Sequence, residues 1–239
     1  MPEKIIYIEK IGNVLFKHSE RARHLNISVK PFSGVKVSIP IGMSYASAIR
    51  LAIQKTQWIK KHLEKMKEIE SQQTIFDKNS GYCTKHHKLN LRKDDRKNIS
   101  VRLSKGKINV IYPNEFSSDS RDVQNAIRTG IERALKIEAK NYLPEKVKSL
   151  ADKFKFNYNK LAIKNIKSRW GSCSGKNNIN LSIHLMRLPE HLIDYVILHE
   201  LVHTVHHNHS PRFWRVLENV TGGAKQLDKE LRKHRTVIY

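Results

Sequence analysis

Cysteine is scarce in this sequence, and long apolar runs are missing from it. The 239 residues include two cysteines, Cys83 and Cys173, which lie far apart and form no disulfide framework. No apolar stretch approaches the roughly 18 residues of a membrane-spanning helix. The first residues, Met1 to Lys4, lack the apolar core of a secretory signal. We therefore expect a cytoplasmic protein with no membrane partner.

Acidic residues are few relative to basic ones. The sequence has 22 Asp and Glu residues against 45 Lys and Arg residues, a formal net charge of +23. Such a charge attracts polyanions, so nucleic acid is an expected partner through the basic surface. A solvated surface with weak, non-specific adhesion is the alternative, because the lysines are spread along the chain. The oligomeric state stays open.

The spacing of the apolar residues predicts an α+β fold. Residues 25–29 and 35–39 alternate between apolar and polar, as strands do, and residues 31–34 form a turn between them. Ser44 is a suitable N-cap for a helix that continues to about Lys67.

The same order of strand, turn, strand, proline and helix recurs further along. Asn98 to Val101 repeats Asn26 to Val29 letter for letter, at a spacing of 72 residues. A strand over 107–112 and a helix over about 119–155, with a break near Pro144, follow. Internal duplication explains this repeat, and chance similarity between two hairpins is the alternative.

The repeat suggests a division of the chain. We expect an N-terminal unit of β-hairpin plus helix over residues 1–75 and a second, larger domain over 80–239. The stretch 71–80 is the best boundary, although no flexible linker separates the parts and they could form one continuous domain.

A further hairpin precedes the most informative motif. Residues 160–167 and 178–185 have strand patterns, and 168–175 reads as a loop between them. The strand over 178–185 could offer its edge to an extended peptide. Pro189 suits the first position of the next helix.

That helix carries His199-Glu200-Leu201-Val202-His203, the pattern H-E-x-x-H. Two histidines four residues apart lie on one helix face, so both imidazoles can bind one metal ion. Zinc lowers the pKa of a bound water toward ~7, and a neighbouring glutamate can act as the general base. The pattern indicates a zinc-dependent hydrolase with Glu200 as the base, although another divalent metal would also serve.

The surroundings of the motif favour this interpretation. Aliphatic residues such as Ile197, Leu198 and Leu201 indicate a helix buried on most sides. An unpaired carboxylate and two imidazoles would cost several kcal/mol there, and a metal ion removes that cost. The alternative is a core helix whose polar groups find ordinary partners.

A tetrahedral zinc site needs a further protein ligand. His206, His207 and His209 follow the motif. If the helix continued, His207 would lie about 12 Å from His199 along its axis. Ligands that far apart on one helix cannot both bind an ion at about 2.0–2.1 Å, so the third ligand should approach from elsewhere.

His209 meets this requirement. Asn208 can end the helix, Ser210 is an N-cap type, and Pro211 suits the first position of a new helix. His209 would then lie in the bend and point back at the metal, in the spacing H-E-x-x-H-x5-H. A downstream carboxylate, chiefly Glu218, is the alternative ligand.

Other residues have less specific patterns. Arg169 could stabilise an oxyanion or bind a phosphate, so it is a second catalytic candidate, or it could form an ordinary surface ion pair. Cys173 could bind zinc, but a small buried residue fits it better. His86 and His87 lack an acid at metal-binding spacing, so we expect them to be exposed.

Several motifs occur together in order. They are Ser168 to Cys173, Asn180-Leu181, Pro189, His199 to His203 and His209 to Trp214. This set resembles the YgjP-like metallopeptidase family, which is related to the SprT-like and WLM zinc peptidases and is also described as UTP pyrophosphatase-like. The resemblance implies a zincin-like core, zinc bound by His199, His203 and His209, and Glu200 as the catalytic base.

The resemblance leaves the substrate open. A zinc peptidase acting on a peptide is the first hypothesis. A nucleoside triphosphate pyrophosphatase using the same metal and Arg169 is the second, although no Gly-rich phosphate loop is present. The third is a nucleic-acid-binding module with a structural metal, which the apparent lack of a fourth protein ligand disfavours.

Overall fold

The computed structural model describes residues 3–30, 34–71, 74–78 and 80–236. Two compact units divide the chain, residues 1–74 and residues 75–238, and each is described by itself. Both units combine helices with sheets, which confirms the expected α+β class. Within the described ranges, no helix is long and apolar enough to cross a membrane.

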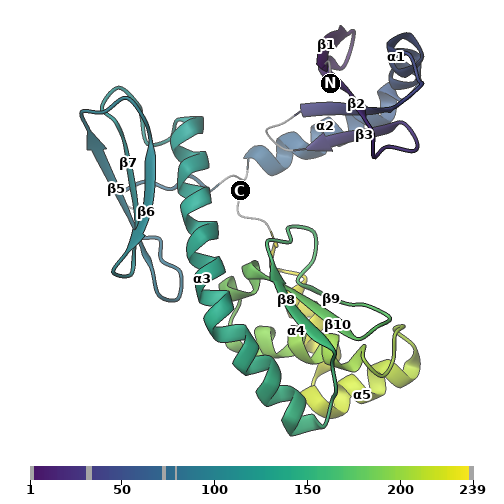
Figure 1. The fold of residues 1–239 in the computed structure, drawn as a ribbon, viewed down its shortest axis with the longest axis vertical. Coiled ribbons are helices and arrows are strands. Elements are labelled where there is room, and N and C mark those ends of the chain that lie inside the picture. The colour runs from purple at the N-terminus through teal and green to yellow at the C-terminus, as the bar shows by residue number, and fades with distance from the viewer. Residues whose placement is uncertain (1–2, 31–33, 72–73, 79, 237–239) are drawn as a thin grey trace. The chain divides into compact units, whose positions relative to one another are not determined.

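The first unit is a four-stranded sheet with two helices. Its elements are β1 (Glu3–Ile8), β2 (Gly12–Ser19), β3 (Asn26–Lys30), β4 (Gly34–Pro40), α1 (Tyr45–Gln54) and α2 (Thr56–Ser71), with strand order β1-β2-β4-β3 (Figure 1). Ser44 caps α1 by accepting the Ser47 backbone N–H, as expected. The single helix expected from Ser44 is interrupted at Lys55. Most of the expected turn, residues 31–33, lies outside the described residues.

The second unit holds two three-stranded sheets, with orders β5-β7-β6 and β8-β10-β9. Its elements are β5 (Lys88–Asp94), β6 (Ser100–Ser104), β7 (Lys107–Pro113), α3 (Arg121–Phe154), β8 (Lys160–Lys164), β9 (Gly171–Cys173), β10 (Asn178–Ser182), the 3-10 helix η1 (Ile183–Arg187), α4 (Glu190–Val202), α5 (Pro211–Thr221) and α6 (Ala224–Leu231). Helix α3 contacts β6 and β7 as well as β8, η1 and α4, so it connects both sheets (Figure 1).

The expected repeat appears as a repeated connectivity. Strands β2 and β4 are parallel and β3 is antiparallel to β4; β5, β7 and β6 are related in the same way. The identical tetrapeptides occupy different positions, however. Val29 pairs with Val35 beside the turn, whereas Val101 pairs with Val110, nearer the middle of its hairpin. Aligning the two identical tetrapeptides therefore does not superimpose equivalent positions of the two hairpins.

Close packing joins α3 to the sheet β5-β7-β6. A Cβ on Gly130 would lie 2.6 Å from Ile108 Cγ2 and 2.9 Å from Val101 Cγ1, so only glycine lets the helix approach this closely. Pro144 lies inside α3, which continues without the expected break.

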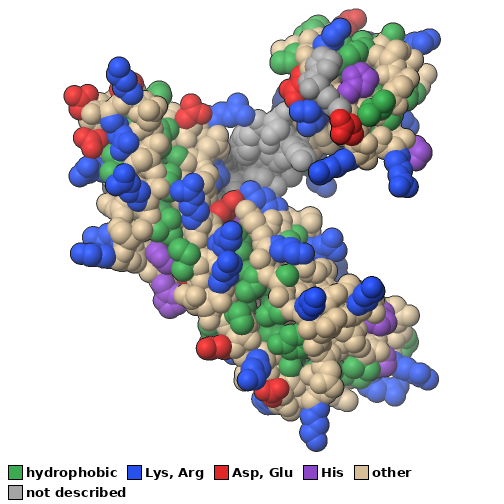
Figure 2. All heavy atoms as spheres, in the orientation of Figure 1, with side chains coloured by type: hydrophobic (Ala, Val, Ile, Leu, Met, Phe, Trp, Pro, Cys, Tyr) green, Lys and Arg blue, Asp and Glu red, His purple; other side chains and the backbone are tan. Residues whose placement is uncertain are grey.

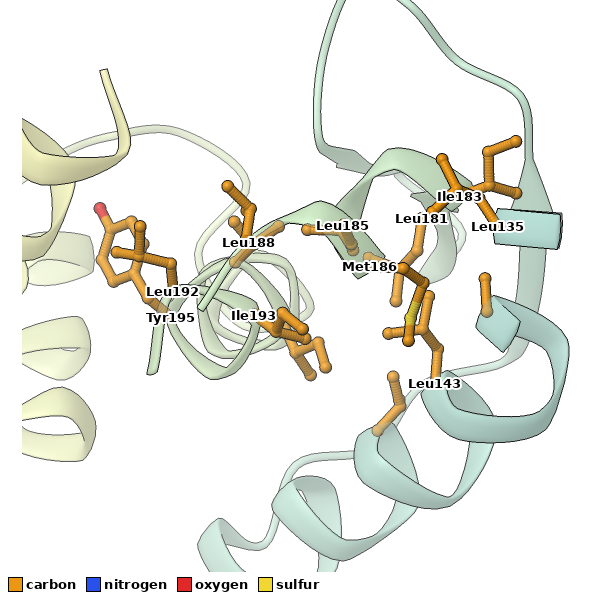
Figure 3. Packing of buried hydrophobic residues seen from close by; sticks show 14 of the residues in the cluster. Leu135, Leu143, Leu181, Ile183, Leu185, Met186, Leu188, Leu192, Ile193 and Tyr195 are labelled. Carbon is orange, nitrogen blue, oxygen red and sulfur yellow. The ribbon is translucent and has the colours of Figure 1, made fainter. Parts of the chain in front are cut away.

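The other half of α3 packs on the elements that carry the H-E-x-x-H motif. Leu135 and Leu143 of α3 lie against residues of β10 and η1, with Ile193 of α4 nearby (Figure 3). Buried apolar side chains surround α4 on most sides, as expected from its sequence. The helix is thus held rigidly in the core of its unit.

Four expectations about the chain before α4 were wrong. The segments 160–167 and 178–185 do not form a hairpin, because β8 and β10 are parallel. The strand expected over 178–185 ends at Ser182 and continues as η1. The expected loop contains strand β9, which makes β10 the central strand, so β10 has no edge for a peptide. His87 is not exposed, because its Nδ1 lies 2.7 Å from the buried Glu138 Oε1.

Candidate metal centre

The last turn of α4 presents His199 and Glu200, and His203 is its C-cap residue. The histidines are four positions apart, which brings their rings to one face with centroids 4.8 Å apart. After a bend, α5 begins with Ser210 as N-cap, whose side chain accepts the Phe213 backbone N–H. The expected helix end, cap and restart are therefore present.

The bend directs His209 back toward the first two histidines. Its Nε2 lies 3.1 Å from His199 Nε2, and candidate ligand atoms of His199, His203 and His209 all lie within 4.8 Å of one another. Two ligands at about 2.0–2.1 Å from one tetrahedral zinc ion would lie about 3.3 Å apart. The three imidazoles therefore fit a single metal ion. Glu218 does not join them, because its Oε2 accepts the Ala224 backbone N–H at the start of α6.

The protonation of these histidines suits metal binding. Burial, with smaller effects from His203 and His209, lowers the pKa of His199 to about 3. Burial also lowers the pKa of His203. His203 Nδ1 lies 2.9 Å from the His206 backbone oxygen and, as a donor to it, leaves Nε2 as the free acceptor. Neutral rings with free lone pairs are what a divalent cation requires.

The apolar ring of Phe213 packs against all three histidine rings. It is fully buried, and its centroid lies 5.0 Å from His199, 4.5 Å from His203 and 4.7 Å from His209. Its position restricts where the imidazoles can move, and it keeps water from that side.

Glu200 is buried beside the histidines, with 5% of its surface exposed. Burial raises the pKa of Glu200 to about 7, against opposing effects of Arg169 and of a backbone hydrogen bond from Cys173. Its Oε2 has no hydrogen-bond partner among the described residues. A carboxylate with a pKa near neutrality and a free oxygen is suited to accept and release a proton.

Strand β9 lies directly against Glu200. A Cβ added to Gly171 would be 2.7 Å from Glu200 Oε1 and 2.8 Å from its Cγ, closer than real Cβ contacts. Sequence reasoning missed this glycine, because its partner is 29 positions away and no local pattern links them.

The remaining candidates are near the centre without joining the histidine cluster. Arg169 is exposed, and its charge acts on Glu200. Burial, and secondarily Glu200, raises the pKa of Cys173, and its thiol is not among the ligand atoms that cluster with the three histidines. His207 is exposed and outside the cluster.

Comparison with known proteins identifies the class. The model of the YgjP-like metallopeptidase domain family matches residues 23–234, so the chain belongs to this family. It is therefore a metal-dependent hydrolase, and the family implies a divalent metal. No curated protein matches the chain.

Two crystal structures of metallopeptidase zymogens are partly similar. Jannalysin of Methanocaldococcus jannaschii is 23% identical with a TM-score of 0.34, over 38% of this chain and 93% of that one. Abylysin of Pyrococcus abyssi is 27% identical with a TM-score of 0.34, over 38% of this chain and 92% of that one.

Proposed function

We propose that this protein is a zinc-dependent peptidase in which His199, His203 and His209 hold the ion and Glu200 is the general base. Bound zinc would supply Lewis-acid activation of water and of the scissile carbonyl. Glu200 takes a proton from the attacking water and delivers it to the leaving amine. The three imidazoles leave room for water, because a fourth protein ligand is absent from the cluster among the described residues.

The observation that carries the proposal is the position and state of Glu200. The carboxyl group is buried next to the histidine cluster, its pKa is raised to about 7, and Oε2 is unpartnered among the described residues. A buried carboxyl oxygen without a partner costs free energy, and such a group is a candidate for a functional role.

The edge of β9 supports a peptide as the substrate. Strand β9 pairs with β10 on one side, and no other described strand pairs with it. The Cys173 backbone forms a hydrogen bond with Glu200, so this edge passes beside the base. An extended peptide added along β9 would therefore place a carbonyl near Glu200. We assign to β9 the role that the sequence suggested for the strand over 178–185.

Arg169 is the second candidate for the reaction. Its guanidinium is exposed and acts electrostatically on Glu200. We propose that Arg169 stabilises negative charge that develops on the substrate during the attack. Arg169→Ala should then lower kcat with zinc content unchanged.

The test compares zinc-loaded wild type with Glu200→Gln. Gln keeps the size of the side chain but cannot accept the proton, so hydrolysis of an unstructured protein should fall by about 10²-fold or more. Glu145→Gln, an exposed change on α3, is the matched control and should keep full activity. Metal analysis should give one zinc in all three proteins.

Nucleoside triphosphates are assayed with the same three proteins and with Arg169→Ala. One result would contradict the proposed peptidase activity and favour a pyrophosphatase. In that result the wild type releases pyrophosphate but cleaves no peptide, and Glu200→Gln or Arg169→Ala abolishes the release. Retained zinc with no hydrolysis of either substrate would favour a structural metal.

A further inference from the structure

The segment that forms the sheet β5-β7-β6 carries a strong positive charge. Residues 85–109 contain nine Lys and Arg residues and two Asp residues, a net +7 of the chain's +23. This is about a third of the net charge in about a tenth of the chain.

One face of this sheet is covered by α3 and the other is polar. Leu91, Ile108 and Val110 point to the covered side and are buried. Alternation along the strands puts the opposite set of side chains on the outer face. These residues are Lys88, Asn90, Arg92, Ser100, Arg102, Ser104, Lys107, Asn109 and Ile111.

The strand register arranges these outer residues in rows. Lys88 lies opposite Lys107, and Arg102 lies opposite Asn109. Like charges on directly opposite residues destabilise a sheet, so the pair Lys88 and Lys107 costs stability without a bound anion. Arg92 is neutralised in part by Asp94 Oδ2 at 2.9 Å. Figure 2 shows Lys and Arg side chains projecting from this part of the surface.

The composition of the outer face limits the kinds of molecule that it can bind. Basic, amide and hydroxyl side chains are the groups with which proteins contact the phosphate and sugar oxygens of nucleic acids. Phe, Tyr and Trp are absent from the outer face, so it offers no platform for stacking unpaired bases. Ile111, partly buried, is its one large apolar residue, which leaves nothing to insert into a lipid surface.

We propose that the outer face of β5-β7-β6 binds the phosphate backbone of a nucleic-acid duplex, without sequence preference. Lys88, Arg102 and Lys107 supply the charge. The amides of Asn90 and Asn109 each use one N–H within the sheet, on Asn109 Oδ1 and Ser104 Oγ, and donate the other to phosphate oxygens. This surface recruits the enzyme to a duplex and takes no part in hydrolysis. The inference does not depend on the proposed peptidase activity.

Fluorescence anisotropy with a labelled 20-base-pair DNA duplex, measured over a range of salt concentrations, tests the proposal. The full chain is compared with a triple variant, Lys88→Gln, Arg102→Gln and Lys107→Gln. A matched triple variant removes the same charge from the exposed lysines of α3, as Lys136→Gln, Lys140→Gln and Lys148→Gln.

The sheet variant should lower the slope of log K against log salt by about 2 to 3, because each lost phosphate contact removes about 0.9. At 0.1 M salt, this is a loss of affinity of about two orders of magnitude. The α3 variant should stay within about twofold of wild type, and both variants should keep the peptide hydrolysis of wild type.

Three results would overturn the proposal. Equal losses in the two triple variants would mean that diffuse charge, and not this face, binds the duplex. Tighter binding of the single strand of the same sequence would assign the surface to another ligand. So would tighter binding of phosphatidylserine vesicles than of the duplex.

Discussion

Gly171 is the residue at which a single methyl group should disable the enzyme. In Gly171→Ala, the new Cβ would meet Glu200 at 2.7 Å from Oε1, 2.8 Å from Cγ and 3.0 Å from Cδ. Ordinary contact begins at 3.4 Å, so the carboxylate must retreat by about 0.7 Å or the strand must shift as much. Glu200 is buried, so it has little space in which to move.

The expected effect follows from this displacement. Misplacing a reacting group by about 1 Å costs on the order of 10²-fold in rate, so kcat should fall by about that factor. Overpacking should also lower the free energy of unfolding by about 1–3 kcal/mol. Zinc content should not change, because the three atoms nearest the new methyl group all belong to Glu200 and none to a histidine. KM should change much less than kcat.

Steady-state peptide hydrolysis, metal analysis and urea unfolding measure these quantities. Gly175→Ala is the matched control from the same segment, because its Cβ would meet nothing within 4 Å. Glu200→Asp shortens the side chain, so combining it with Gly171→Ala should restore part of the lost stability. Wild-type kcat in Gly171→Ala, or equal losses in Gly171→Ala and Gly175→Ala, would refute the reasoning.

Two further predictions concern histidines. His209→Ala should weaken zinc binding by more than about 100-fold, because changing a residue that only hydrogen-bonds to a metal ligand already lowers metal affinity 10–100-fold. The control is His207→Ala, a change of an exposed histidine. The measurement is the zinc that each variant retains against a competing chelator. Equal zinc retention in the two variants would contradict the assignment of His209 as a metal ligand. His184 is fully buried with Nε2 2.9 Å from Asn165 Oδ1, and burial, with a smaller effect of Arg187, lowers its pKa from 6.5 to about 4. Between pH 6.5 and 4, the imidazole is therefore protonated in the unfolded state and neutral in the native state. The contribution of His184 to the free energy of unfolding is fully present above pH 6.5, and the free energy of unfolding falls by about 3 kcal/mol as the pH drops to 4. His184→Gln does not titrate and should lose that part of the pH dependence of urea unfolding; an unchanged dependence would contradict the assignment.

Local features of this protein could be predicted from the sequence, because neighbouring residues dictate them. Side chains four positions apart meet on a helix whatever surrounds it, so His199 and His203 had to share a face. Ser210 and Pro211 start a helix through their own backbone preferences, and this start places His209 in a bend. The metal cluster is thus nearly a local property of one stretch of chain.

Distant contacts needed the tertiary structure. Residues 171–173 have no strand pattern of their own and become an edge strand only by pairing with β10. The raised pKa of Glu200 depends on burial against Gly171, and His87 is withdrawn from solvent by Glu138, 51 positions away. Strand pairing and burial depend on which distant residues meet, so no window of sequence contains them. The sequence by itself determined which groups could bind a metal, and the packing decided the environment of Glu200.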